Sequence, residues 1–435
     1  MTSKKILLLG VAASLIAFAA GRPENKGRLE EHRALAQVGL VDPALVVSWN
    51  QTINDIGFAE VFSFPKAIRA HVMMHIAMHD ALNAVIPLYR QYAYHSHEPG
   101  AHPIAAAAQA AHGVGVSQYP DQQAKLDAEL ARWLSAIPET PHKARGIAVG
   151  RRSAAAILAL RVNDGWDYQG TYTFSNEPGA YQTTPPWNGF VLQPGFRYAR
   201  PFGLRSPDQF RPDPPPRLDT AQYAAAFNEV KDFGRVNSVI RTPEQTLYAV
   251  WWMEFAETSV NRLARQLATQ RRLHLWQAAR MFSLINMGLY DGYVAVWDSK
   301  YEYNHWRPYT AMREAAADGN PATVPDPTWE PLRTTPPFPD YVSAHATGTK
   351  ATMEILARTF GDNTPFTMAT TTAPPQMPTR SFRSFSAAAA ECADSRVQLG
   401  WHFRYATDAG VALGRAVADR LDKNHLEFRA ASPQH

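Results

Sequence analysis

Hydrophobic residues recur at helical spacing along most of the chain. In the segment 64–86, apolar side chains repeat every three or four residues after Pro65 and predict one long buried helix. The same pattern predicts further helices at 104–111, 121–136, 143–162, 220–236, 243–267, 273–300, 344–360, 382–399 and 409–422. No sustained alternation of apolar and polar residues predicts a strand. The expected fold class is therefore all-α, a helical bundle.

Two irregular stretches interrupt the helical pattern, at 167–218 and 318–341. The first is rich in proline, which removes a backbone donor and fixes φ, so it predicts an irregular connection. Its aromatic residues indicate that it packs on the helices. We expect an N-terminal helical part with this connection at 21–217 and a second helical bundle at 218–435.

The first 20 residues have the pattern of a secretory signal peptide. Two lysines precede an apolar run from Ile6 to about Ala20, and small residues stand at the cleavage positions. A membrane anchor is the alternative, but the run is shorter than the ~20 residues that span a bilayer. We expect an exported protein, periplasmic or secreted, without stable membrane insertion after cleavage of residues 1–20.

The composition excludes several classes of function. The chain carries 43 Lys and Arg against 39 Asp and Glu and has no long basic run, so nucleic acid is not an expected partner. A single cysteine, Cys392, excludes an intramolecular disulfide and every multi-cysteine metal site. No nucleotide or haem cofactor is expected. The oligomeric state is not predicted.

Two basic clusters lie in the last third of the chain. Lys300 and Arg307 are seven residues apart, which on one helix places both on the same face, about 10 Å apart along the axis. A proline-rich segment then ends at Ser343, the predicted N-cap of the helix at 344–360. Ala344 and His345 would follow in the first turn, where free N–H groups and the helix dipole attract an anion.

A third cluster contains Arg396 and His402, six residues apart. A straight helix would place them on different faces, but Gly400 can end the helix and turn His402 back. A lone cation on a helix is usually a solvated residue, and a lone histidine is usually structural. Only the three clusters together indicate an oxyanion cage with a nucleophile or ligand and an acid/base.

The three clusters resemble the vanadium-dependent haloperoxidase branch of the type-2 phosphatidic acid phosphatase superfamily. That family carries Lys, six residues and Arg-Pro, then Pro-Ser-Gly-His, and then Arg, five residues and His. The corresponding residues are Lys300 to Arg307-Pro308, Val342-Ser343-Ala344-His345, and Arg396 to His402. Weaker similarity covers most of the chain after residue 20. The resemblance implies that 218–435 is the catalytic helical bundle.

The resemblance also implies roles for individual residues. His402 would be the axial ligand of vanadate, or the phosphoryl-accepting nucleophile of a phosphatase, and His345 the general acid/base. Vanadate would act as a Lewis acid on hydrogen peroxide. Trp297 and Phe338 match positions on the halide side. The groups that would hold vanadate or phosphate are Lys300, Arg307, Ser343, the backbone of Ala344, Arg396 and His402.

Three functions follow from this resemblance. The first is vanadate-dependent oxidation of halide by hydrogen peroxide, with a small organic molecule accepting the halogen. The second is an acid phosphatase that hydrolyses phosphomonoesters through a phosphohistidine at His402. The third is a non-catalytic relative that binds an oxyanion or a metal.

This sequence departs from the family pattern at the cage. Ala344 replaces the glycine of the second motif, and Val342 replaces its proline. The family usually has an aspartate four residues after the third-motif histidine, which orients the imidazole, and Ala406 stands there. Asp408, two residues further on, is the expected substitute.

A separate histidine series lies in the helix predicted at 64–86. His71, His75 and His79 are spaced by four residues, which aligns imidazoles along a helix and is compatible with zinc, copper or iron. The alternative is that they are buried histidines with structural hydrogen bonds. The related family has a similar helix, which favours the structural role.

Overall fold

The computed structural model describes residues 23–39, 42–58 and 64–429, so the predicted signal peptide at 1–20 lies outside the described residues. This part of the chain forms 14 α-helices and one short hairpin of two strands, which confirms the all-α class. The α-helices are α2 (Pro23–Val38), α3 (Ala44–Gly57), α4 (Phe64–Val85), α5 (Pro103–Gln118), α6 (Gln123–Ser135), α7 (Pro141–Leu160), α8 (Ala221–Phe233), α9 (Pro243–Trp251), α10 (Ala256–Gln270), α11 (Leu275–Tyr303), α12 (Pro308–Glu314), α13 (Ala344–Phe360), α14 (Phe385–Gln398) and α15 (Arg404–Asn424). The antiparallel strands are β1 (Phe366–Ala369) and β2 (Thr379–Phe382).

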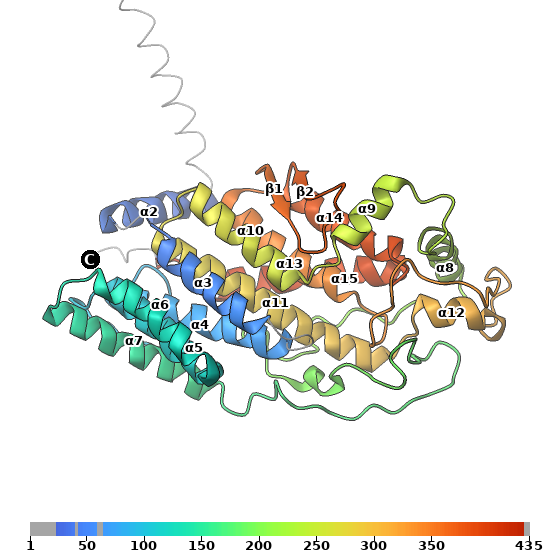
Figure 1. Ribbon diagram of the computed structural model, residues 1–435, viewed down its shortest axis with the longest axis horizontal. Coiled ribbons are helices and arrows are strands. Elements are labelled where there is room, and N and C mark those ends of the chain that lie inside the picture. Colours follow the sequence, from blue (N-terminus) through green and yellow to red (C-terminus); the bar gives the residue numbers. More distant parts are fainter. Residues whose placement is uncertain (1–22, 40–41, 59–63, 430–435) are drawn as a thin grey trace, which may run out of the picture.

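Helix α11 runs through the middle of the molecule (Figure 1). Nearly every residue from Leu275 to Lys300 is buried, because this helix is apolar on all sides and other helices surround it. It contacts α3 and α4 from the N-terminal part and α13 and α15 from the C-terminal part. The core therefore continues across residue 217, the predicted boundary between the two regions.

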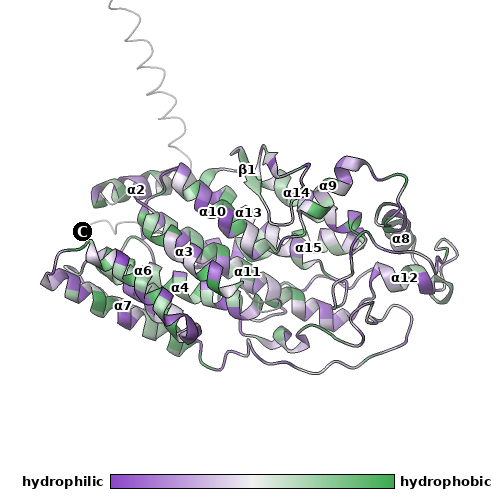
Figure 2. Ribbon diagram, in the orientation of Figure 1, coloured by the Kyte–Doolittle hydropathy of each residue, from purple (hydrophilic) through white to green (hydrophobic). Residues whose placement is uncertain are grey.

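The N-terminal helices pack closely because small residues face one another. Helices α5 and α7 contact along their lengths, and a Cβ at Gly150 of α7 would lie 2.3 Å from the Ala106 carbonyl oxygen of α5. The alanine-rich face of α5 allows this close approach. Helices α6 and α7, at the outer edge of the molecule, carry both hydrophilic and hydrophobic positions (Figure 2).

The helix predicted at 243–267 is instead two helices. Thr242 caps α9 through a capping box with Gln245, α9 ends at Trp251, and α10 starts at Ala256. The break leaves backbone carbonyl groups without helical partners, and Arg396 donates to the Trp252 carbonyl at 2.7 Å. Helical periodicity alone does not predict this break, since the partner that uses the freed carbonyl is distant in the sequence.

The proline-rich connection packs on the helices, as predicted from its aromatic residues. Its short 3₁₀ helix η2 (Pro194–Tyr198) places Phe196 edge-on against Tyr290 and Trp297 of α11. Trp187 donates to the Thr335 carbonyl at 2.6 Å, which joins the two irregular stretches. None of the helices among the described residues has the length and apolar character needed to cross a membrane.

Candidate functional site

Lys300 and Arg307 lie together, but not on one helix face as predicted. Helix α11 ends at Tyr303, where Asn304 adopts a left-handed conformation with φ 48°, and Arg307 follows as the N-cap of α12. The chain turn, not two turns of helix, brings the cations together. Both lie 4.9 Å from the ring centroid of Phe338, the Lys300 Nζ and the Arg307 Cζ alike.

Backbone carbonyl groups hold both cations in place. Lys300 Nζ donates to the carbonyls of Pro339 and Asp340 at 2.7 and 2.9 Å. Arg307 donates to the carbonyls of Phe338 and Trp401, both at 2.8 Å. Burial lowers the pKa of both groups, and for Lys300 the nearby Arg307 lowers it further. The cations are fixed by neutral dipoles, so their charge remains available for an anion.

The start of helix α13 completes another side of the site. Ser343 is its N-cap, as predicted, but its side chain makes no capping hydrogen bond, and its buried Oγ has no hydrogen-bond partner among the described residues. The first N–H groups of any helix lack partners inside the helix. Ala344 and His345 therefore present backbone donors beside a free hydroxyl group.

Gly400 turns the chain back at the end of helix α14, as predicted. Its φ is +76°, and a Cβ there would lie 2.6 Å from the Gly234 carbonyl oxygen, so the turn requires glycine. Arg396 is fully buried and donates to the Trp252 carbonyl and to Ser395 Oγ, while its Nη1 has no partner among the described residues. The turn places His402 beside Arg307, with 3.2 Å between Nη1 and Nε2.

Asp340, not Asp408, contacts His402. Asp340 Oδ1 lies 2.8 Å from His402 Nδ1, and the Asp340 side chain is fully buried. Asp408 is exposed, and the charges that act on it are those of Arg404 and Glu229. The predicted substitute for the missing aspartate is therefore wrong, because the helix turn between positions 406 and 408 points Asp408 into solvent.

The contact with Asp340 sets the tautomer expected for His402. A carboxylate beside Nδ1 favours the proton there, which leaves the lone pair on Nε2. Burial and then the nearby Arg307 and Lys300 lower the pKa of His402 well below its usual value, so the ring is neutral. Burial raises the pKa of Asp340 to about 7, against the opposing effects of Arg307 and Lys300. A neutral imidazole with its lone pair on Nε2 is suited to be a ligand or a nucleophile, and Arg307 Nη1 lies 3.2 Å from that atom.

His345 faces the same site from the first turn of α13. Its Nε2 has no partner among the described residues, and its ring lies 6.4 Å from the Trp401 ring and 6.2 Å from the Phe255 ring, centroid to centroid. Burial and then Arg396 lower the pKa of His345 well below its usual value. The second imidazole is therefore also neutral and free to exchange a proton at Nε2.

The unpartnered atoms of this cage fit an oxyanion. Arg307 Nη2, Arg396 Nη1 and Ser343 Oγ are buried donors without a partner among the described residues. Of the three buried cations, Arg307 has an acidic group within 4 Å, Asp340 at 3.7 Å, and no ion pair of the described residues involves Lys300 or Arg396. Uncompensated buried charge is strongly unfavourable, so these cations are suited to bind an anion. Vanadate and phosphate both supply acceptor oxygens and negative charge.

The cage opens into a cavity of about 640 Å³. Ala344, His345 and His402 line one part of it. Trp297 and Phe338, the predicted halide-side residues, also line it, with 5.2 Å between their ring centroids. Residues from both predicted regions form the walls, including Phe64 of α4 and Trp187 of the proline-rich connection.

Glu257 and Tyr293 form a buried pair at the cavity wall that the sequence patterns do not indicate. The Tyr293 hydroxyl donates to Glu257 Oε2 at 2.8 Å, and Glu257 is 1% exposed. Burial raises the pKa of Glu257 to about 7 and raises that of Tyr293 well above its usual value. Neither residue belongs to a motif, so only their meeting across α10 and α11 reveals the pair.

This raised pKa predicts a pH-dependent stability difference between the wild-type protein and the Glu257→Gln variant. The folded protein binds the Glu257 proton more tightly than the unfolded chain, whose pKa is near 4.5, so the free energy of unfolding falls as the pH rises from 4.5 to 7. The amide of the Glu257→Gln variant does not titrate, so this fall in the free energy of unfolding is absent from the variant. We expect the variant to gain about 3 kcal/mol relative to wild type between pH 4.5 and 8. Denaturant unfolding across this range measures it, and a constant difference would contradict it.

The histidine series of helix α4 is structural. His71 Nδ1 lies 2.8 Å from the Ala67 carbonyl, and His75 Nε2 lies 2.9 Å from Asn50 Nδ2 on α3. Burial lowers the pKa of His71 to about 4. Among the described residues, no group of three or more His, Cys, Asp or Glu side chains is placed to hold a metal ion. The alternative of a metal site at His71, His75 and His79 is therefore not formed among the described residues, because each ring contacts a different partner.

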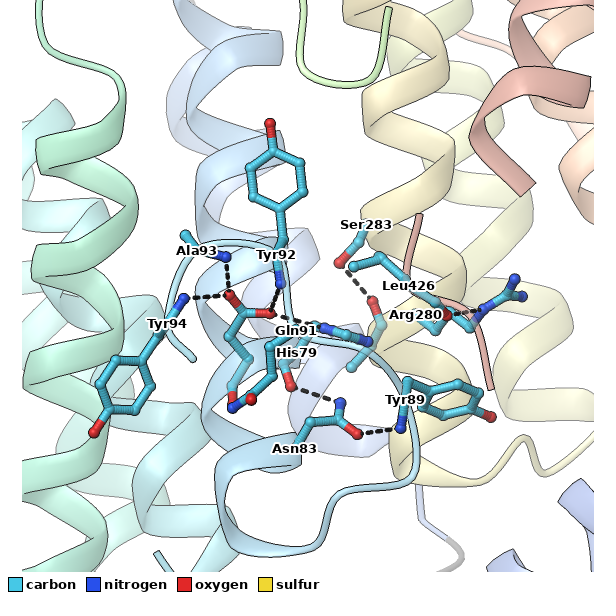
Figure 3. A network of polar contacts seen from close by, with 12 residues as sticks. His79, Asn83, Tyr89, Gln91, Tyr92, Ala93, Tyr94, Arg280, Ser283 and Leu426 are labelled. Atoms are coloured by element: carbon cyan, nitrogen blue, oxygen red, sulfur yellow. Dashed lines mark hydrogen bonds and ion pairs between the residues drawn. The ribbon is translucent and has the colours of Figure 1, made fainter. Parts of the chain in front are cut away.

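His79 takes part in a network that anchors the segment after α4 (Figure 3). Its Nδ1 lies 3.1 Å from the Asp80 carboxylate. That carboxylate accepts three backbone N–H groups, from Tyr92 at 2.8 Å, Ala93 at 2.6 Å and Tyr94 at 2.9 Å. The Asp80 carboxylate is thus used by these backbone donors, and it holds residues 92–94 against the end of helix α4.

Comparison with known proteins finds similarity to vanadium haloperoxidases. The family model described as the VCPO second helical-bundle domain matches residues 280–429, which contain all three motifs. A vanadium chloroperoxidase of Curvularia inaequalis is 27% identical in an alignment of 198 residues, which covers 39% of this chain. That match spans 30% of the length of this curated relative.

Solved structures give the same family over a larger part of the chain. The structure described as the first bacterial vanadium-dependent iodoperoxidase is 25% identical, with a TM-score of 0.76, covering 91% of this chain and 99% of that chain. A holo-type bacterial vanadium-dependent chloroperoxidase shares the fold at 19% identity, with a TM-score of 0.66, covering 84% of this chain and 92% of that chain. Together, these matches support the assignment of the chain to the vanadium haloperoxidase superfamily.

Proposed function

We propose that the protein is a vanadate-dependent haloperoxidase that oxidises a halide with hydrogen peroxide. One observation carries this proposal: three buried donors without partners among the described residues, Arg307 Nη2, Arg396 Nη1 and Ser343 Oγ, lie in one cage with the imidazole of His402. The similarity to a bacterial vanadium-dependent iodoperoxidase over 91% of the chain favours halide oxidation among the reactions that such a cage can support.

Each residue of the cage has a defined task in this proposal. Lys300, Arg307 and Arg396 would neutralise the oxyanion, and Ser343 Oγ and the Ala344 N–H would donate hydrogen bonds to it. His402 Nε2 would be the protein ligand, with Asp340 holding its Nδ1 proton. When bound, vanadate would supply Lewis acidity that activates peroxide without a change in oxidation state.

His345 would handle the proton of the reaction. Oxidation of a halide ion by hydrogen peroxide to a hypohalous acid and water consumes one proton. His345 Nε2 is free and lies at the cavity, so it can take a proton from peroxide and return it to the leaving oxygen. Trp297 and Phe338 would form the wall past which the halide approaches.

A phosphatase reaction at the same cage is the second candidate. His402, with Asp340 Oδ1 2.8 Å from its Nδ1 and its Nε2 on the other side of the ring, also has the geometry of a nucleophile for phosphoryl transfer. In that reaction His345 would protonate the leaving alcohol.

The deciding experiment compares both activities in one preparation of the purified protein. We expect bromide- or iodide-dependent halogenation of a dye in the presence of hydrogen peroxide, only after addition of orthovanadate. Hydrolysis of p-nitrophenyl phosphate without vanadate is the parallel assay. The His402→Ala variant is the negative control for both assays, and we expect it to be inactive in each. Vanadate-independent ester hydrolysis without any halogenation would replace the haloperoxidase proposal by the phosphatase.

We also propose that residues 1–20 direct export and are then removed, that 218–435 is the catalytic bundle, and that 21–217 completes the cavity wall. Mass spectrometry of the exported protein locates its first residue. Recovery of the protein with residues 1–20 intact would contradict the proposed cleavage.

A further inference from the structure

The cavity beside the cage is much larger than the proposed inorganic substrates require. Its volume is about 640 Å³, whereas one water molecule occupies about 30 Å³ in the liquid, and peroxide or a halide ion is of similar size. Cavities of about 300–1,000 Å³ are typical of sites for small organic molecules. Most of this space is therefore left over after the peroxide and halide are accommodated.

The walls of this space are aromatic and apolar. The rings that line it come from distant parts of the chain, namely Phe58, Phe64, Trp187, Phe255, Trp297 and Phe338. A small inorganic ion gains little from such walls, because its solvation depends on charges and hydrogen bonds. A planar organic ring gains both apolar burial and stacking contacts.

Two buried acceptor atoms interrupt the apolar wall. Glu257 Oε2 accepts from Tyr293, but Oε1 of the same carboxyl has no partner among the described residues. Asn54 Oδ1 on helix α3 also lacks one. A buried acceptor without a donor is unfavourable, and native proteins rarely keep one without a reason. Both residues line the cavity, so a ligand in the cavity can supply the missing donor.

Of these two acceptors, the Glu257 carboxyl lies close to the proposed reaction centre. Helix α13 begins beside the cage, and Tyr293 packs against Gly348, where a Cβ would lie 2.8 Å from the tyrosine ring. Gly348 is about one helical turn after His345. A ligand held by Glu257 therefore has its ring near His345.

We propose that this cavity, the acceptor cavity, binds an aromatic molecule with an O–H or N–H group, which donates to Glu257 Oε1 while the ring lies among the aromatic walls. The assignment as a substrate rests on the proposed function: the bound ring is the organic acceptor of the oxidised halogen. In that reaction a ring C–H bond is replaced by a carbon–halogen bond. Halide, hydrogen peroxide, the aromatic molecule and one proton give the halogenated product and two waters.

Calorimetric binding to the full mature protein without vanadate tests the cavity independently of the enzymatic reaction. The probe is 2-naphthol, and the matched probe is 2-methoxynaphthalene, which has the same ring but no O–H donor. We expect wild type to bind 2-naphthol at least ten-fold more tightly than 2-methoxynaphthalene. Equal affinities, or no binding of either probe, would overturn the proposal, and this comparison needs no variant.

Two variants then test the role of Glu257. Glu257→Leu keeps a side chain of similar size without an acceptor, so we expect the preference for 2-naphthol to fall below two-fold while 2-methoxynaphthalene still binds. Asp55→Asn is the control, since Asp55 lines the same cavity but is exposed, and the preference should persist. A preference retained in a folded Glu257→Leu protein would exclude Glu257 as the recognition group. Binding without halide oxidation would reject the proposed function and leave the ligand site standing.

Discussion

The Arg396→Met variant is expected to lose oxyanion binding and yet to be more stable than wild type without a ligand. Arg396 is fully buried, its Nη1 has no partner among the described residues, and no ion pair compensates its charge there. Methionine has a similar length and no charge, so it removes the desolvation cost of the guanidinium. Loss of the hydrogen bonds to Trp252 and Ser395 offsets part of this gain, and we expect a net increase of about 1–2 kcal/mol in the free energy of unfolding.

The same substitution should weaken vanadate binding by about 100-fold, because it removes a charge and the charge-assisted hydrogen bonds of one guanidinium. Denaturant unfolding with and without vanadate measures both effects. Wild type should gain about 2.7 kcal/mol at a vanadate concentration 100 times its Kd, and the variant about 0.4 kcal/mol at that concentration.

Arg404→Met is the matched control for Arg396→Met. Arg404 forms ion pairs with Glu229 at 2.6 Å and with Asp394 at 2.7 Å, so its charge is already compensated. This variant should bind vanadate like wild type and gain no stability. If Arg396→Met instead bound vanadate normally, Arg396 would be a structural residue and the cage as described would be incorrect.

Asp340→Ala is expected to weaken vanadate binding by about 10- to 100-fold, the usual effect of removing a group that orients a ligating histidine. Without the Asp340 carboxylate, whose Oδ1 lies 2.8 Å from Nδ1, a neighbouring negative charge no longer favours the proton on Nδ1 of His402. The tautomer with the proton on Nε2 then becomes populated, and this tautomer has no lone pair facing the cage. Calorimetry measures the affinity, and ¹⁵N chemical shifts of the His402 ring report the tautomer, which a merely structural effect would not change.

The double variant Asp340→Ala/Ala406→Asp tests whether the orienting carboxylate has moved between two positions. Position 406 is where the related family usually carries the aspartate, and Ala406 is fully buried beside the His402 turn. We expect the double variant to recover most of the lost affinity and the original tautomer. The Asp408→Ala control should bind vanadate like wild type. An unchanged tautomer in Asp340→Ala would contradict the role of Asp340.

The sequence by itself determined the helical class and predicted which residues form the candidate oxyanion cage. Helix periodicity, the N-cap at Ser343 and the turn at Gly400 depend on residues within a few positions of each other, so local patterns predict them. The spacing of Lys300, Arg307, Arg396 and His402 carried the resemblance to the family. The predictions that failed in these segments assumed that a helix continues, as between Lys300 and Arg307 or through 252–255.

The tertiary structure alone decided which groups support that chemistry. Asp340 lies beside His402, the break before α10 frees the Trp252 carbonyl for Arg396, and Glu257 meets Tyr293 at the cavity wall. Each contact joins segments that are far apart along the chain. Such contacts depend on how the helices pack around α11, and packing is fixed by the shape of the whole core and not by the periodicity of any one segment.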